Sequence, residues 1–161
     1  MKRFTTRILL AGCVIGLIVT SQVVDAQTIN TVAGLNFGNV YPSVPKTITK
    51  RTAGGAAEFH VSGTAGAEVL ITFLALPSYL SQGGFNMNVI ISNNDCALDS
   101  SAVPNQSSPS FDNVNPWQPI TYRLGSNGLT IWLGGMVVPN IGQKPGSYSG
   151  PIQVKVQYTG N

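Results

Sequence analysis

The stretch Gly146-Ser147-Tyr148-Ser149-Gly150-Pro151-Ile152-Gln153-Val154-Lys155-Val156-Gln157-Tyr158 decides the fold of this chain. After the turn residues, Ile152, Val154, Val156 and Tyr158 alternate strictly with glutamine and lysine. Successive side chains of a β-strand point to opposite faces, so this pattern predicts a strand with one apolar and one polar face.

Similar alternation recurs along the chain, interrupted by glycine, proline and asparagine. Together with the C-terminal strand, it predicts strands at residues 35–40, 57–62, 68–74, 87–91, 120–124 and 129–138, the last interrupted at Gly134-Gly135, and a short edge strand at 47–49. No long segment after residue 27 carries the period of a helix. Seven or eight short strands with turn signals between them predict an all-β protein, and we favour an antiparallel Ig-like sandwich.

Several of these strands carry more specific predictions. Residues 57–62 alternate cleanly, so Ala57, Phe59 and Val61 are expected to face the core, whereas residues 68–74 look buried on both faces. The turn at residues 125–128 contains an Asn-Gly pair, which predicts a hairpin between its two flanking strands. Two consecutive glycines at 134–135 predict a kink or bulge in the second of those strands.

Residues 93–119 form a polar stretch rich in serine, asparagine and proline, with a possible short strand around Phe111. A loop of this length inside a compact domain is typically functional or flexible. It contains Cys96, which is the only cysteine after residue 26 and therefore has no partner for an internal disulfide. An inert thiol is the simpler interpretation; an intermolecular bridge is the alternative.

The N-terminal segment predicts export. Three basic residues precede an apolar run from Ile8 to Val19, and Val24-Asp25-Ala26 offers a cleavage site after Ala26. This is the organisation of a secretory signal peptide, and the run is short for a membrane anchor. Residues 1–26 are thus predicted to be a signal peptide and residues 27–161 a single domain. A lipoprotein box ending at Cys13 is an alternative, although the apolar run continues beyond it.

The composition of the predicted domain argues against a nucleic-acid partner. Residues 27–161 hold six of the nine basic and five of the six acidic residues, so their net charge is +1. Lys46, Lys50 and Arg51 are the only basic cluster, and nucleic-acid binding requires a wider basic surface. Scarce charge also leaves the sheet edges prone to self-association.

Residue types that carry chemistry are few. His60 is the only histidine, and it cannot build a catalytic triad or a multi-histidine metal site. Asn93, Asn94, Asp95 and Asp99 lack the spacing of a calcium loop and are better explained as turn residues. We therefore expect no enzyme activity, cofactor or metal. Trp117 and Tyr79 are candidate ligand-binding residues, because aromatic rings stack on sugars, although such rings more often fill a core.

The order of four motifs resembles a bacterial family of secreted domains, the domain-of-unknown-function 4402 family. These motifs are residues 35–40, residues 57–63 with Gly66, Leu133-Gly134-Gly135, and residues 145–150. The family is similar in turn to spore-coat-U-like and archaic chaperone–usher pilin subunits. The resemblance implies an incomplete Ig-like sandwich that a neighbour completes by donating a strand, and it makes Gly146 and Tyr158 similar to a pair in the last pilin strand.

Two features depart from the pilin pattern. The predicted domain cannot form the internal disulfide that many pilins have, and Gln27 to Gly34 offers only Ile29 and Val32 as strong apolar residues of a donor arm. We therefore leave open a self-complete sandwich, a tip or capping subunit, or another surface protein.

The expected function is a non-catalytic structural protein, exported to the periplasm, cell surface or medium and without an integral membrane anchor. Ile152, Val154, Val156 and Tyr158 are its candidate assembly strand. Its expected partners are further copies or other surface subunits, with a periplasmic chaperone and usher. The alternative is an adhesin-type module that binds a carbohydrate or other ligand through residues 93–119.

Overall fold

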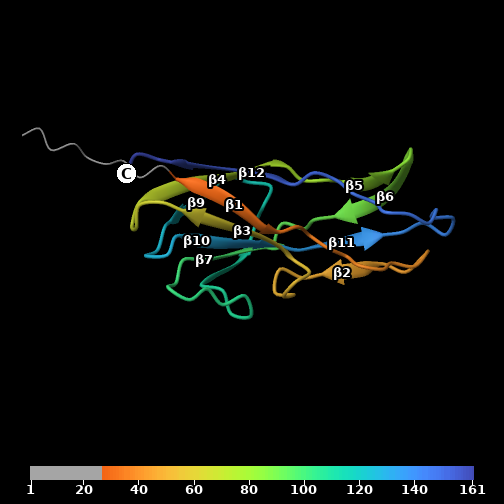
Figure 1. The fold of residues 1–161 in the computed structure, drawn as a ribbon, viewed down its shortest axis with the longest axis horizontal. Coiled ribbons are helices and arrows are strands. Elements are labelled where there is room, and N and C mark those ends of the chain that lie inside the picture. Colours follow the sequence, from red (N-terminus) through yellow and green to blue (C-terminus); the bar gives the residue numbers. More distant parts are fainter. Residues whose placement is uncertain (1–26) are drawn as a thin grey trace, which may run out of the picture.

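The computed structural model describes residues 27–161, which form β-strands and loops without a helix (Figure 1). None of the described residues therefore belongs to a helix that could cross a membrane. The predicted leader, its cleavage site and Cys13 lie outside these residues. The strands are β1 (Thr28–Ala33), β2 (Lys46–Ile48), β3 (Ala57–Ser62), β4 (Glu68–Ala75), β5 (Tyr79–Gln82), β6 (Phe85–Ile90), β7 (Cys96–Asp99), β8 (Phe111–Val114), β9 (Ile120–Arg123), β10 (Leu129–Leu133), β11 (Gly135–Val138) and β12 (Gln153–Tyr158).

The strands form three antiparallel sheets. A five-stranded sheet has the order β1-β3-β10-β7-β8, a four-stranded sheet the order β2-β11-β6-β5, and a three-stranded sheet the order β12-β4-β9. One apolar core joins them: Phe59, Leu98 and Ile131 of the five-stranded sheet are buried with Ile71 and Val156 of the three-stranded sheet. The predicted all-β sandwich is confirmed.

A single glycine separates two consecutive strands that the sequence predicts as one interrupted strand. β10 and β11 are consecutive along the chain and are separated only by Gly134. β3 and β7 flank β10, and β2 and β6 flank β11 in the same way. The predicted kink at this glycine thus divides one long layer into two sheets and gives the molecule its long axis (Figure 1).

The predicted inward face of β3 is confirmed, and alternate residues of β6 are buried in the same way. Ala57, Phe59 and Val61 are buried, and so are Met87 and Val89. The expectation that β4 is buried on both faces is wrong. Val69 and Ile71 are fully buried, but the intervening residues are only partly covered and Leu74 is 61% exposed.

The predicted first strand at 35–40 is also wrong. The first strand is β1, and residues 35–40 form an irregular segment in which Gly38 has a positive φ of 58°. The Gly38 amide donates to the Asn36 side chain at 2.8 Å, which is the local turn that asparagine favours. Phe37 is nevertheless buried, so the apolar alternation reflects packing against the core without sheet pairing.

The predicted hairpin across residues 125–128 is wrong for a different reason. The turn itself forms, and Gly125 and Gly128 exchange backbone hydrogen bonds of 2.9 and 3.1 Å. However, β9 pairs with β4, whereas β10 pairs with β3 and β7, so the two arms belong to opposite layers. Leu124 and Leu129 are both buried beside the turn, and the chain therefore arches around the core.

The stretch 93–119 is more ordered than a long loop. The expected short strand around Phe111 is confirmed as β8. A further strand, β7, is not predicted by the sequence, and all four of its residues are buried. Only four residues long and flanked by polar turns, β7 shows no readable period. Cys96 is the first residue of this strand and is completely buried.

Gly134 is expected to be indispensable for stability. A Cβ atom here would lie 2.6 Å from both the Ile48 carbonyl oxygen and the Lys50 amide nitrogen, which are backbone atoms that cannot rotate away. Gly134→Ala should lower the free energy of unfolding by about 1–3 kcal/mol in urea denaturation. Gly142→Ala, which meets nothing within 4 Å, is the matched control and should change it by less than about 0.5 kcal/mol. Equal effects of both substitutions would contradict this account.

The Cys96 thiol is expected to be inert in the folded protein. Burial raises its pKa to about 12, so the reactive thiolate is scarce at neutral pH. A thiol reagent at pH 8 should label the native domain slowly and the urea-unfolded domain at once. Rapid stoichiometric labelling of the native domain would show that Cys96 is accessible and would reopen the possibility of an intermolecular bridge.

Candidate functional site

The most unusual feature of the fold is a place where two sheet edges face each other without pairing. β1 is an edge of the five-stranded sheet, and β12 is an edge of the three-stranded sheet. No backbone hydrogen bond joins these two strands within residues 27–161. A side-chain contact bridges the gap at one end, because Gln27 Nε2 donates to the Val156 carbonyl.

An open cavity of about 350 Å³ lies between these edges and is mainly apolar. It is lined by Ile29, Thr31, Phe59, Leu74, Ile152, Gln153 and Val154. Ile29 lies opposite Val61 in the β1–β3 ladder and therefore shares its inner face. Val61 is fully buried, but Ile29 remains 39% exposed, which shows that the inner face is uncovered at this edge.

The gap continues along the molecule beyond the two strands. Residues 35–40, which follow β1, and residues 146–150, which precede β12, line a second cavity of about 370 Å³. Its other lining residues, Leu80, Met87 and Val137, belong to the four-stranded sheet. A third cavity of about 160 Å³ shares Val40, Met87, Gly146 and Tyr148 with the second.

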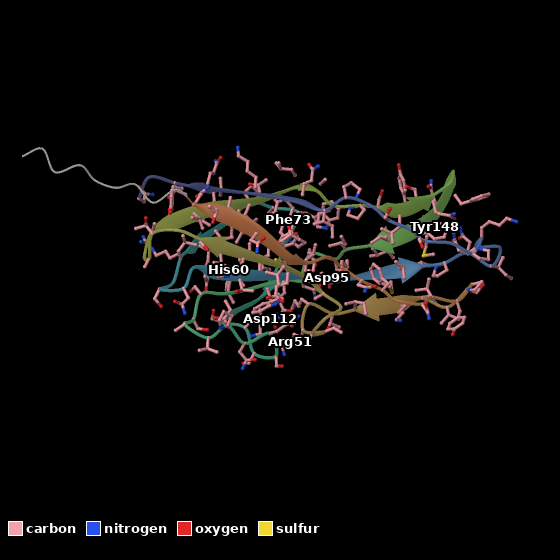
Figure 2. All side chains as sticks on the ribbon, in the orientation of Figure 1. Arg51, His60, Phe73, Asp95, Asp112 and Tyr148 are labelled. Atoms are coloured by element: carbon pink, nitrogen blue, oxygen red, sulfur yellow. The ribbon has the colours of Figure 1, made fainter. Side chains whose placement is uncertain are left out.

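We call this row of three cavities the seam. Its two walls are residues 27–42 and residues 139–156, which run side by side in opposite directions. Figure 1 shows both walls following the long axis, in orange and in blue. Tyr148 lies on the seam toward the four-stranded end, far from His60 (Figure 2). There its hydroxyl donates to the Lys144 carbonyl at 2.9 Å, which orders this part of the wall.

The seam is suited to binding an extended chain. Edge strands carry unpaired backbone donors and acceptors, and a strand added there would satisfy them. The apolar side chains that line the first and third cavities offer alternate side chains of such a strand a place to be buried. No charged side chain lines the first two cavities, so charge would be costly to bury along most of the seam.

The four predicted assembly residues divide into two pairs. Ile152 and Val154 line the seam. Val156 is buried in the core, and Tyr158 fastens the end of β12, because its hydroxyl accepts a 2.8 Å hydrogen bond from the Thr64 amide. Tyr158 packs closely against the turn that follows β3, because a Cβ atom on Gly63 would lie 2.3 Å from the Tyr158 hydroxyl oxygen.

The two candidate ligand-binding aromatics lie elsewhere. Tyr79 and Trp117 are each 51% exposed, and neither lines the seam. Trp117 donates its Nε1 proton to the Ile91 carbonyl at 2.9 Å, and Tyr79 of β5 lies opposite Asn88 of β6. Their role in binding stays a prediction.

Asp99 organises the remaining loop after β7. Its carboxylate accepts hydrogen bonds from the Ser101 and Asn105 amides, both at 2.9 Å, and from the Ser110 hydroxyl at 3.1 Å. Burial alone would raise the pKa of Asp99, but these hydrogen bonds outweigh burial and hold the pKa below its ordinary value. The aspartate predicted to be a turn residue is thus a buried anchor.

A second polar cluster ties the turn at 49–52 to β8. Asp112 forms ion pairs with Lys50, at 3.0 Å, and with Arg51, and Figure 2 shows Arg51 and Asp112 together at the edge of the molecule. Lys50 also donates to the Asn113 side chain at 2.8 Å. Lys50 and Arg51, two of the three residues in the predicted basic cluster, are therefore paired with a carboxylate of the same domain, and we interpret this cluster as structural.

His60 and Asp95 each contact a neighbouring polar group. His60 Nδ1 is 3.5 Å from the Thr130 hydroxyl. The Asp95 carboxylate accepts a 2.7 Å hydrogen bond from the Ser92 amide. Across residues 27–161, no group of three or more histidine, cysteine or acidic side chains gathers where it could hold a metal ion.

Residues 43–158 match the family described as "Domain of unknown function (DUF4402)". The chain belongs to this family. No curated protein matches the chain. The match confirms the predicted membership of this family, and it begins after the seam-lining residues of β1 and after the first of the four motifs, residues 35–40.

Sequence reasoning identifies one wall of the seam and misses the other. Ile152 and Val154 are visible through their alternation in β12. Ile29 and Thr31 give no comparable signal, because residues 27–34 contain few strong apolar residues. Phe59 and Leu74 belong to strands that the pattern predicts, but their exposure to a gap depends on which strand lies opposite.

Asp99→Asn should destabilise the protein in a pH-dependent way. The lowered pKa means that Asp99 contributes stability above its unfolded pKa of about 4, and this contribution is lost as pH falls through the still lower folded value. The variant should lose about 1–3 kcal/mol of unfolding free energy at pH 7. Urea titrations from pH 7 to pH 2 should show the difference from wild type shrinking below about pH 4. A difference independent of pH would contradict the assignment.

Proposed function

We propose that this protein is a non-catalytic, exported structural protein that joins other subunits by accepting a β-strand at the seam. It would serve as a surface, coat or pilus-like subunit. The observation that carries the proposal is the pair of unpaired edges, β1 and β12, separated by a mainly apolar gap. Burial of an added strand would pair these edges and cover the exposed parts of Ile29 and Leu74.

The leader predicted at residues 1–26 is the basis for proposing export. Assembly by strand addition is proposed from the unpaired edges and from the sequence resemblance to spore-coat-U-like and chaperone–usher subunits, which the family match does not test. In this proposal a periplasmic chaperone would occupy the seam first, and an usher would then exchange it for a subunit. Each exchange needs only backbone pairing and apolar burial, which suits a domain whose described residues bring no catalytic group to the seam.

In-cell photo-crosslinking tests the proposal. A photoreactive residue at Gln153, which lies in the seam, should give a ladder of crosslinked species in the exported fraction. The same residue at Val103, 82% exposed and outside the seam-lining residues, is the control and should give little.

Val154→Asp should abolish the ladder, because it places a charge in the apolar gap, whereas Val103→Asp should preserve it. Circular dichroism and urea midpoints would establish that both variants fold. A ladder that persists in folded Val154→Asp, or the absence of any ladder at Gln153, would contradict the proposal.

The second candidate is an adhesin-type module that binds a carbohydrate or other ligand through residues 93–119. One observation favours it: the Trp117 ring is half exposed, yet the hydrogen bond to Ile91 fixes its orientation. A preoriented ring is what sugar stacking requires. A glycan array that compares wild type with Trp117→Ala would test this, and unchanged binding, or none, would remove it.

A further inference from the structure

The charge around the seam is distributed unevenly along the long axis. The acidic residues among 27–161 are Glu58, Glu68, Asp95, Asp99 and Asp112, and they lie on or beside strands of the five-stranded and three-stranded sheets. None lies on the four-stranded sheet or lines any of the three seam cavities. The far end of the seam is therefore without negative charge.

Two lysines stand at that end. Lys144 lines the third cavity. Lys46 of β2 donates to the Asn39 carbonyl at 3.1 Å, which brings its ammonium group to the wall of the second cavity. Neither forms an ion pair with a carboxylate of residues 27–161, unlike Lys50, Arg51 and Arg123. Lys155 of β12 also forms no ion pair with a carboxylate of residues 27–161, but it is exposed and does not line the first cavity. The lining of the seam thus changes from uncharged at β1 and β12 to cationic beyond Tyr148.

We infer that the strand accepted by the seam belongs to a partner whose segment is uncharged along its apolar part and carries acidic side chains at the end that lies beside Lys144. This inference rests on the proposed function and adds the partner's chemistry. Charge complementarity across an interface fixes register and suppresses wrong partners more than it adds affinity. Lys46 and Lys144 would therefore set how far along the seam the strand is seated.

The length of the partner segment follows from the wall. Residues 143–154 reach from the third cavity to the first, and part of this wall is irregular, so an extended segment of at most about twelve residues, at about 3.3 Å per residue, would span all three cavities. Alternate positions would face the apolar floor formed by Phe59, Leu80 and Val137. The intervening positions would face outward and could be polar.

Binding of fluorescent peptides tests the inference. Three peptides of about twelve residues, with both ends blocked, would alternate valine with threonine. They would differ only in the last two residues at one end, which would be two glutamates, two glutamines or two lysines. Fluorescence anisotropy at low salt should rank affinity as glutamate, then glutamine, then lysine. The glutamate peptide should bind up to about five-fold more tightly than the glutamine peptide, as expected for exposed charge pairs, and the difference should fall at high salt.

Charge reversal supplies the matched comparison. Lys144→Glu adds an acid that offsets the charge of Lys46, so it should remove the preference for the glutamate peptide. Lys155→Glu makes the same change in net charge on β12, where the side chain is exposed and does not line the seam, and should leave the ranking unchanged. Urea midpoints equal to that of wild type would establish that both variants fold.

The outcomes distinguish failure of the inference from failure of the proposed function. If all three peptides bind wild type equally and Val154→Asp abolishes that binding, the seam accepts a strand but the acidic-end inference is overturned. The inference is also overturned if Lys144→Glu and Lys155→Glu shift the ranking equally. If no peptide binds wild type at all, the proposed function fails, and the inference fails with it.

Discussion

A strand edge that is neither paired nor covered leaves its backbone groups to water, and at the seam this fold has two such edges opposite each other. β1 and β12 end their sheets opposite each other, and the hydrogen bond that Gln27 donates to the Val156 carbonyl bridges them at one end. The rest of the structure arranges the two walls around this gap. Tyr158 fixes one end of β12 through the Thr64 amide, and Gly134 lets the central layer turn so that both walls extend along its whole length.

The core and the seam depend on the same residues. Phe59 is buried with the core while it also lines the first cavity, and Met87 and Val137 do the same in the second. A strand bound in the seam would therefore complete the core, and it would not merely attach to the surface. Burial of apolar side chains and pairing of backbone groups would therefore both favour binding of a strand in the seam. A charged residue in the gap is expected to weaken that binding, because its charge would have to be buried.

The sequence predicts those features whose cause is local. Period-two alternation identifies β3, β6 and β12, and consecutive glycines identify the kink between β10 and β11. The failures have longer-range causes. The Asn127-Gly128 turn forms as expected, yet the strands on either side join opposite layers, because pairing with β4, β3 and β7 decides their place. β7 escapes prediction because its four buried residues are too few to show a period. The seam could not be predicted from any one segment, since it is defined by the absence of a strand between two others.

Amide hydrogen exchange of the isolated domain, followed residue by residue, tests the open seam most directly. In an edge strand, alternate amides point away from the neighbouring strand and have no partner. The account predicts that the seam-facing amides of β12 exchange orders of magnitude faster than those of β10, which is paired on both sides, and that they become protected when a strand-forming peptide binds. Protection of every β12 amide at the level of β10 in the free domain would show that the edge is already paired, and would contradict the account.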